Sequence, residues 1–349
     1  IGWIFSIAIL MLGISSAIFG TWVEKAGPRA SMVAAGSCWV AGFLIASLGI
    51  MTGQLWLVYF GYGFIGGIGL GIGYISPVST LIRWFPDRRG MATGLAIMGF
   101  GGGAMIGAPV NGWLLNLYER APEFLGAQGA VATVVENGRV FAETAAGQVE
   151  VVIASAAQAA EYGGQAGVYV VGTGNTGAAQ TFLTLGIVYF IVMVIAAFQY
   201  RVPAADWKPA GWVPKPAKSG MVTQNNVHID QALKTPQFWL LWIMLCFNVT
   251  AGIGVIGVAK TMMGEIFGSA LPLVVTAAFT STYVMMISVF NMCGRFFWAS
   301  ASDYLGRQAT YMCFFVLGTA LYLSIPFFAS AVATNPSMIY LLGFYIATM

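Results

Sequence analysis

Charged side chains are scarce in this sequence. Only 8% of the residues are Asp, Glu, Lys or Arg, and 58% are hydrophobic, whereas soluble domains use about a quarter charged residues. This scarcity excludes an ordinary soluble domain and a nucleic-acid-binding protein. Apolar runs long enough to cross a hydrocarbon core of ~30 Å as helices, without the alternation of barrel strands, predict an all-α membrane protein embedded in a lipid bilayer.

The sequence lacks the residue patterns that metal binding, nucleotide binding and nucleophilic catalysis require. The cysteines (Cys38, Cys246, Cys293, Cys313) stand singly within apolar segments without metal-ligand spacing, so we expect packing roles, no metal site and no cofactor. The chain has no G-x-x-x-x-G-K-[ST] loop, which argues against a nucleotide partner and direct ATP drive. No nucleophile is paired with a base and a third orienting group, so we expect no enzyme. The single histidine, His228, fits a solvated linker better than a pH sensor.

The hydrophobic segments define the organisation of the chain. We predict spans at about residues 1–23, 30–51, 55–82, 91–117, 179–200, 236–259, 272–299, 309–330 and 338–349. A Pro- and Lys-rich stretch, 201–235, separates an N-terminal half (1–200) from a C-terminal half (236–349) as a linker would.

Residues 119–178 form a polar insert within the N-terminal half. Two β-prone runs flank Asn137-Gly138, which is the strongest short hairpin signal. The later run VEVVIAS would add a third strand. We therefore predict a small β-element, with a disordered loop as the alternative.

Basic residues indicate the topology. Eleven of the fifteen Lys and Arg residues fall in the loops 24–29, 83–90, 201–235 and 303–307, which the positive-inside bias makes cytoplasmic. The insert is then extracytoplasmic, and the predicted location is the cell (inner) membrane of a multi-pass protein. Lys260, near the outer end of its span, is explained by snorkelling.

Two charged turns repeat one design. In each, a small residue precedes an acid by four positions, a glycine follows the acid by three, and basic residues complete the turn. The first copy contains Gly20, Glu24, Lys25, Gly27 and Arg29, and the second contains Ala299, Asp303, Gly306 and Arg307. With Glu for Asp, an inserted Pro28 and Ala299 for Gly, they resemble the cytoplasmic signature G-x-x-x-D-[RK]-x-G-R-[RK] of the major facilitator superfamily.

Three further stretches, IRWFPDRRGMATG, LKTPQFWLLW and FNMCGRFFWASASDYLGR, are similar to the oxalate/formate antiporter family. The resemblance implies a major-facilitator-type bundle of two pseudo-symmetric halves, here covering the second to the tenth of twelve helices and therefore truncated at both ends. We expect a monomer. The resemblance also implies that the basic turn of Arg83, Asp87, Arg88 and Arg89 pairs with Glu24 or Asp303 when the cytoplasmic side closes; a topology anchor is the alternative.

Arg295 lies within an apolar span, about 12 Å deeper than Asp303 at ~1.5 Å per residue. A guanidinium there costs about 2.5–3.5 kcal/mol, so we expect a partner. A substrate carboxylate would match its planar fork, whereas an intramembrane ion pair or carbonyl contact would hold helices together. No acid lies inside any span, which favours the substrate.

In the similar family, the residue at this position binds the anion, paired with a lysine in the eleventh helix. Asn291 and Ser288, one and two turns earlier on the same face, would orient Arg295. Tyr74 aligns with a site aromatic of that family and would shape the pocket; a packing tyrosine is the alternative.

Glycines recur at four-residue spacing, which allows close helix contact. One face presents Gly63, Gly67 and Gly71. Another presents Gly99, Gly103 and Gly107, followed by Pro109. We predict helix packing at both faces, with a gating role as a further alternative.

We therefore expect a secondary carrier of small carboxylate anions that exchanges one anion for another by alternating access. A proton-coupled monocarboxylate symporter for lactate or pyruvate is one alternative, and a non-transporting membrane sensor whose insert captures a ligand is another. The missing intramembrane carboxylate favours exchange, because proton coupling commonly uses one.

Overall fold

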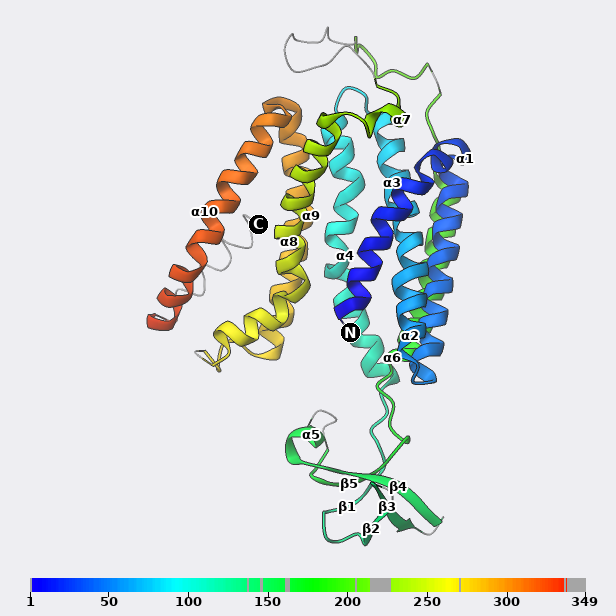
Figure 1. The fold of residues 1–349 in the computed structure, drawn as a ribbon, viewed down its shortest axis with the longest axis vertical. Helices are drawn as coiled ribbons and strands as arrows, with labels where there is room; N and C mark the ends of the chain where they lie inside the picture. The colour runs from blue at the N-terminus through cyan, green and yellow to red at the C-terminus, as the bar shows by residue number, and fades with distance from the viewer. Residues whose placement is uncertain are drawn as a thin grey trace. The chain divides into compact units, whose positions relative to one another are not determined.

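The computed structural model is mainly helical (Figure 1). It describes residues 2–136, 138–144, 147–160, 164–204, 206–213, 227–269, 271–335 and 337. The long helices within the described residues are α1 (Gly2–Met51), α3 (Gly67–Trp84), α4 (Arg89–Tyr118), α6 (Ala178–Gln199), α8 (Pro236–Phe267), α9 (Ala277–Leu305) and α10 (Arg307–Thr334). The short ones are α2 (Leu55–Val58), the π-helix η1 (Tyr59–Gly66), α5 (Ala156–Ala160) and α7 (Ile229–Ala232).

Helix α1 contains two of the predicted spans. Its chain reverses at Gly27, whose φ of 80° and ψ of 169° are not helical, and Pro28 follows directly. A left-handed φ costs glycine little, which explains the glycine at this reversal. In the described part of the chain, 7 helices are long and apolar enough to cross a membrane. The prediction of an all-α, multi-pass membrane protein is confirmed, while the span predicted at 338–349 lies outside the described residues.

The chain divides into two compact units. Unit 1 contains residues 1–76 and 109–201, and unit 2 contains 77–108 and 202–349. The predicted division at 201–235 placed residues 77–108 in the N-terminal half, whereas their contacts group them with unit 2.

Aromatic side chains form much of the helical core of unit 1. The Phe43 ring, 5% exposed, lies 5.2 Å from the Trp39 ring, 5.4 Å from Tyr62 and 5.3 Å from Phe182. These rings join α1, η1 and α6. Between membrane-spanning helices such packing stabilises through van der Waals contact, because lipid tails are as apolar as the rings.

The predicted face of Gly63, Gly67 and Gly71 lies against the part of α1 that precedes Gly27. A Cβ at Gly63 would lie 3.0 Å from Ile7, and one at Gly67 would lie 2.7 Å from Met11. A Cβ at Gly71 would meet Ser15. Only glycine allows the backbones to come this close.

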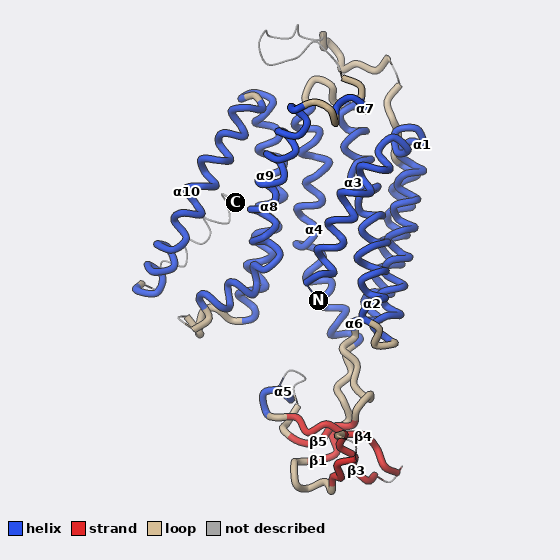
Figure 2. The backbone as a smooth tube through the Cα atoms, viewed as in Figure 1, coloured by secondary structure: helices blue, strands red, loops and turns tan. Residues whose placement is uncertain are grey.

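The insert folds as one antiparallel sheet, drawn in red in Figure 2. Its strands are β1 (Phe124–Gly126), β2 (Thr133–Glu136), β3 (Arg139–Thr144), β4 (Gly147–Ala154) and β5 (Gly167–Val170), in the order β1-β5-β4-β3-β2. Ala142, Val151 and Val168 are its buried core. Glu136 pairs with Arg139, so β2 and β3 form the predicted hairpin around residues 137–138, although Asn137 itself is outside the described residues. The third predicted strand is β4; β1 and β5 were not predicted.

In unit 2, an apolar cluster joins α8, α9 and α10. Met263, Phe267, Leu271, Phe328 and Val332 are its buried members. The cluster holds α9 between its two neighbours in sequence, and α9 carries most of the predicted site.

Candidate functional site

Arg295 is half-buried in α9 and contacts only neutral groups among the described residues. Its Nε donates a hydrogen bond of 2.6 Å to Oδ1 of Asn291, one turn earlier. The ring of Phe100 in α4 lies against the guanidinium, with 5.4 Å from Cζ to the ring centroid. Asn291 thus contacts Arg295 directly, and its predicted role in orienting the arginine for an anion stays a prediction.

The two neutral contacts are strong enough to keep Arg295 in an apolar helix. A hydrogen bond to a charged group contributes about 1.5–3 kcal/mol, and a cation–π contact about 0.5–2 kcal/mol. Together they match the insertion cost of about 2.5–3.5 kcal/mol. The cost therefore needs no anion to offset it, but neither contact cancels the positive charge.

The terminal nitrogens of Arg295 are the free edge of its fork. Within the described residues, neither Nη1 nor Nη2 has a hydrogen-bonding partner, and the one contact of Nε goes to Asn291. A carboxylate can accept two parallel hydrogen bonds from such an edge. The arrangement thus leaves a single, end-on position for a planar anion.

Gly101 of α4 makes room for this pair. A Cβ at this position would lie 2.6 Å from Oδ1 of Asn291 and 3.1 Å from Cδ of Arg295. Neither Gly101 nor Phe100 was predicted at the site, because both lie almost two hundred residues away from Arg295 along the chain.

Ser288 does not orient Arg295. Ser288 is 5% exposed, and its hydroxyl donates to the Gly101 carbonyl at 2.7 Å and accepts from the Met105 N–H at 3.1 Å. The prediction that Ser288 orients the arginine is corrected, because its donor and one acceptor lone pair are already engaged with α4.

Tyr74 lies half-buried in α3, in unit 1. Its predicted role in shaping an anion pocket stays a prediction.

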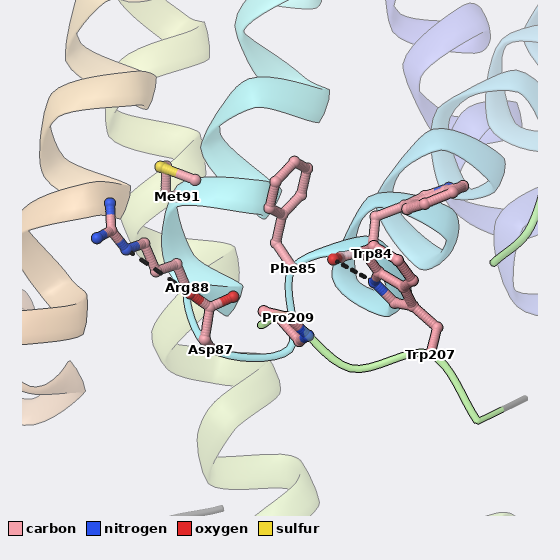
Figure 3. A pocket seen from close by; sticks show the side chains of 7 residues that line it. All are labelled: Trp84, Phe85, Asp87, Arg88, Met91, Trp207 and Pro209. Atoms are coloured by element: carbon pink, nitrogen blue, oxygen red, sulfur yellow. Dashed lines mark hydrogen bonds and ion pairs between the residues drawn. The ribbon is translucent and has the colours of Figure 1, made fainter. Parts of the chain in front are cut away.

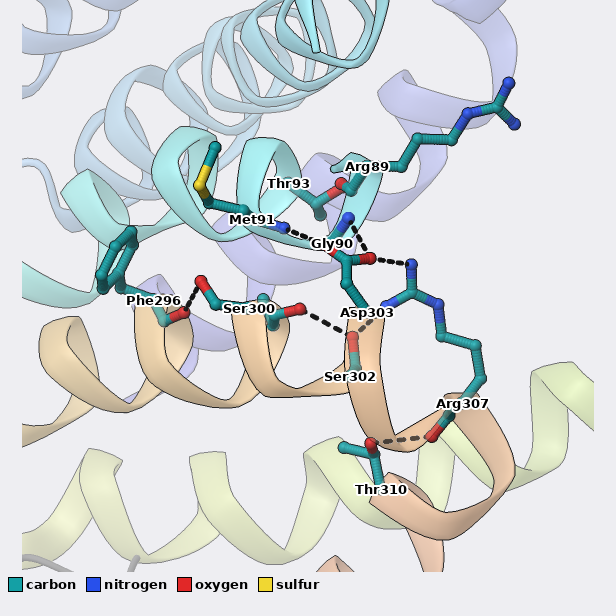
Figure 4. Close-up of polar contacts among 12 residues, drawn as sticks. Arg89, Gly90, Met91, Thr93, Phe296, Ser300, Ser302, Asp303, Arg307 and Thr310 are labelled. Carbon is teal, nitrogen blue, oxygen red and sulfur yellow. Dashed lines mark hydrogen bonds and ion pairs between the residues drawn. The ribbon is translucent and has the colours of Figure 1, made fainter. Parts of the chain in front are cut away.

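The Asp303 carboxylate caps the first turn of α4 (Figure 4). It accepts hydrogen bonds of 2.9 Å from the N–H groups of Gly90 and Met91 and one of 2.9 Å from Nη2 of Arg307. Arg307 also donates to the Ser302 hydroxyl. A negative charge at a helix N-terminus satisfies unpaired N–H groups and complements the helix dipole.

The basic turn meets Asp303 through its backbone and not through its arginine side chains. Arg88 instead lies 3.8 Å from its neighbour Asp87. Among the described residues, Arg83, Arg88 and Arg89 form no side-chain pair with Asp303 in this arrangement, and their pairing when the cytoplasmic side closes stays a prediction.

Glycines of α4 lie where α9 comes closest. A Cβ at Gly90 would lie 2.6 Å from Asp303 Oδ1, and one at Gly94 would lie 2.8 Å from the Arg295 carbonyl oxygen and from Ala299 Cβ. Nothing among the described residues lies within 4 Å of a Cβ at Gly99, Gly103 or Gly107. The packing role predicted for these three therefore finds no partner in this part of the chain, and their position before Pro109 remains a prediction about motion.

The first charged turn is built differently from the second. Glu24 and Lys25 are exposed and form no ion pair within the described residues, and a Cβ at Gly20 would meet nothing within 4 Å. Arg29 donates through Nε to the Tyr200 carbonyl at 3.2 Å, beside the end of α6. Among the described residues, the second copy caps a helix N-terminus and the first does not.

A cavity of about 250 Å³ lies beside the turn between α3 and α4 (Figure 3). Trp84, Phe85 and Trp207 line it, and Trp207 donates through Nε1 to the Trp84 carbonyl at 3.1 Å. This hydrogen bond joins the start of the predicted linker to the end of α3. No group of three metal-ligating residues occurs within the described part of the chain.

Comparisons with known proteins agree with this architecture. Residues 1–135 match the family model described as Major Facilitator Superfamily. The chain is 24% identical over 311 residues to the oxalate:formate antiporter of Oxalobacter formigenes, covering 89% of this chain and 56% of that protein. It is also 24% identical over 306 residues to the uncharacterized MFS-type transporter YhjX of Escherichia coli K12, covering 87% of this chain and 57% of that protein.

A shorter likeness reaches a third kind of transporter. Over 118 residues the chain is 32% identical to monocarboxylate transporter 13 of Bos taurus, covering 34% of this chain and 27% of that protein. The chain spans a little over half the length of the first two relatives.

Proposed function

We propose that this chain, a multi-pass membrane protein of the major facilitator superfamily, is the main part of a secondary carrier that exchanges small carboxylate anions. The observation that supports this proposal is the free edge of Arg295. Its Nε is held by the neutral Asn291 at 2.6 Å, and its terminal nitrogens have no partner among the described residues. A fixed charge in an apolar helix attracts an anion strongly, because low dielectric weakens screening.

The proposed binding step needs no proton. A carboxylate approaches in the plane of the guanidinium and accepts two hydrogen bonds from Nη1 and Nη2. Phe100 occupies a face of the guanidinium, so it does not compete for that edge. Asn291 has no titratable group, and its contact therefore keeps the same charge at every physiological pH.

Exchange follows from the unbalanced charge. Asn291 and Phe100 offset the insertion cost in the arrangement described here, but a change of state that breaks these contacts without an anion would expose an uncompensated cation, and such a charge is costly in the bilayer. With one carboxylate bound, the pair is neutral and the change of state becomes easier. We therefore infer obligatory exchange, in which each direction of movement carries an anion, on the predicted cytoplasmic and extracytoplasmic sides alternately.

A proton-coupled monocarboxylate symporter is the second candidate. The likeness to monocarboxylate transporter 13 favours it. The neutral partner of Arg295 favours exchange instead, since within the described residues this pair includes no group that accepts a proton.

Counterflow into liposomes tests both candidates with the full-length protein. Labelled oxalate or formate should enter only vesicles preloaded with a carboxylate, and a pH gradient alone should drive no uptake. Uptake driven by the pH gradient alone would favour the symporter. No uptake under either condition, from correctly folded protein, would contradict transport of these anions and favour a sensor.

A further inference from the structure

The Ser288 hydroxyl bonds to two backbone groups of a neighbouring helix, α4. It bonds to the Gly101 carbonyl at 2.7 Å and to the Met105 N–H at 3.1 Å. These two groups are four residues apart in α4, and a regular α-helix joins such a pair directly. A side chain inserted into this ladder is a recognised cause of helix bending.

The following step of the same ladder is also weak. Pro109, four residues after Met105, has no N–H, so the Met105 carbonyl lacks its usual donor within the helix. Five of the residues 99–107 are glycine, and glycine lowers helix stability by about 1 kcal/mol each relative to alanine. We therefore expect the part of α4 that Ser288 contacts to bend more easily than a regular helix.

Two arrangements can give hydrogen-bonding partners to the Ser288 hydroxyl, the Gly101 carbonyl and the Met105 N–H in an apolar environment. In the arrangement seen here, Ser288 bridges Gly101 and Met105. In the other, Gly101 and Met105 bond directly, and the Ser288 hydroxyl turns to the carbonyl of Val284 in its own helix, as buried helical serines do. Neither arrangement leaves the Ser288 hydroxyl, the Gly101 carbonyl or the Met105 N–H without a partner, which would cost several kcal/mol in lipid.

We propose that Ser288 is a polar latch between α4 and α9, which closes when its hydroxyl enters the α4 ladder and opens when that ladder reforms. The proposal deepens the carrier function given above and rests on it. Gly101 is contacted by Ser288 and also lies beside the Arg295 stem. The latch therefore acts on the same turn of α4 that borders the proposed anion position.

The proposed latch predicts that removing the hydroxyl favours the open arrangement over the closed one. In Ser288→Ala, the closed arrangement loses both bridging bonds, whereas the open arrangement keeps the direct Gly101–Met105 bond. Hydrogen bonds between membrane helices are modest, so we expect the open-to-closed ratio to rise about three- to tenfold. Ser288→Cys keeps the size with a weaker donor and should fall between the two.

Pulsed EPR on the full-length protein in liposomes measures this ratio. Spin labels at Leu95→Cys in α4 and Phe297→Cys in α9, both exposed in this structure, report the separation in a background without the native cysteines. Ser300→Ala is the matched control, because Ser300 also lies in α9 but donates to the Phe296 carbonyl of its own helix at 2.7 Å. A longer-distance population that grows in Ser288→Ala and not in Ser300→Ala supports the latch.

Two results would overturn the proposal. One is an unchanged distance distribution in both Ser288 variants, and the other is an equal change in Ser300→Ala. The amide exchange of residues 99–108 gives a second measurement, because this segment should change its protection in Ser288→Ala only. If the protein carries no carboxylate but the distances respond as expected, the latch stands and the transport proposal fails.

Discussion

Arg295 is held by its Nε and covered on one face by an aromatic ring, so the shape of its remaining edge decides what it can bind. Lysine would keep the charge but has no planar edge, and its flexible ammonium would not meet Asn291 and a carboxylate in the same way. Replacing Arg295 with lysine therefore distinguishes a role in binding a carboxylate from a role that needs only a positive charge.

Arg295→Lys should reduce exchange about ten- to hundredfold, the effect expected when a hydrogen bond between charged groups worth about 1.5–3 kcal/mol is lost. Labelled-anion exchange in liposomes measures it, and thermal unfolding in detergent checks the fold. Lys260→Gln is the control, since Lys260 is an exposed cation of α8. Unchanged exchange in Arg295→Lys would remove the basis of the proposed site.

Asn291→Asp should make transport sensitive to acid. An ionised carboxylate 2.6 Å from Nε would cancel the charge of Arg295 and repel a substrate anion, so exchange should be lowest at neutral or higher pH. Acidification protonates the new carboxyl, restores a neutral partner and raises exchange. The wild type and Asn291→Ala should show no such recovery over the pH range in which the substrate stays ionised. An equally flat profile for Asn291→Asp would contradict the assigned contact.

At the scale of the helix, α4 has one face against α9 and another without a partner in the described residues. The faces differ by what an added methyl group would meet. A Cβ at Gly94 would lie 2.8 Å from backbone and side-chain atoms of α9, and one at Gly103 would meet nothing within 4 Å.

Gly94→Ala should destabilise the protein and Gly103→Ala should not. Overpacking costs about 1–3 kcal/mol, and the better helix propensity of alanine returns about 1 kcal/mol. At Gly103 only the gain in helix propensity applies. The midpoints of thermal unfolding, compared with the wild type, give the sign of each change. A lower midpoint in Gly103→Ala equal to that in Gly94→Ala would argue against the α4–α9 contact.

Asp303→Asn should weaken the start of α4 by about 0.5–2 kcal/mol, because a charged acceptor at a helix N-terminus is replaced by a neutral one. Hydrogen exchange at the amides of Gly90 and Met91 should speed up. Asp87→Asn is the control, since among the described residues the Asp87 carboxylate pairs with the largely exposed Arg88 at 3.8 Å, and such pairs contribute about 0–1 kcal/mol. Equal rates of amide hydrogen exchange at Gly90 and Met91 in the two variants would show that Asp303 is not the cap.

Local patterns predicted the elements better than their partners. The apolar runs predicted eight spans that the structure describes as helices, and Asn137-Gly138 predicted a hairpin. The strands β1 and β5 were missed because they are short, contain glycine and pair with each other from about forty residues apart. The family resemblance suggested the arginines of the basic turn as partners of Asp303, whereas Asp303 accepts hydrogen bonds from backbone N–H groups of that turn and from Arg307, and a backbone N–H leaves no mark in the sequence. Phe100 and Gly101 were missed for the same reason, since only folding brings them to Arg295.

For the molecule as a whole, the insert is the feature that distinguishes a carrier from a sensor. Its sheet has its own buried core of Ala142, Val151 and Val168. Its two connections to α4 and α6 meet at one place, where Arg120 and Asn175 exchange backbone hydrogen bonds of 2.8 and 2.9 Å. The ends of the insert are thus already at the distance that a tight turn requires.

Replacing residues 121–174 with Asn-Gly should leave a folded, active carrier. The two-residue turn suits an antiparallel pair such as Arg120 and Asn175, and the excised segment takes its own core with it. Anion exchange by the excised protein should match the wild type, and adding Arg295→Lys should abolish most of it, which shows that the flux still passes the same site. Loss of exchange with unchanged thermal unfolding would mean that the sheet takes part in transport or in ligand capture. Because the proposed anion contact lies in unit 2 and the sheet in unit 1, a carrier whose chemistry depends on Arg295 should keep its exchange without the sheet, and a sensor should not keep its response.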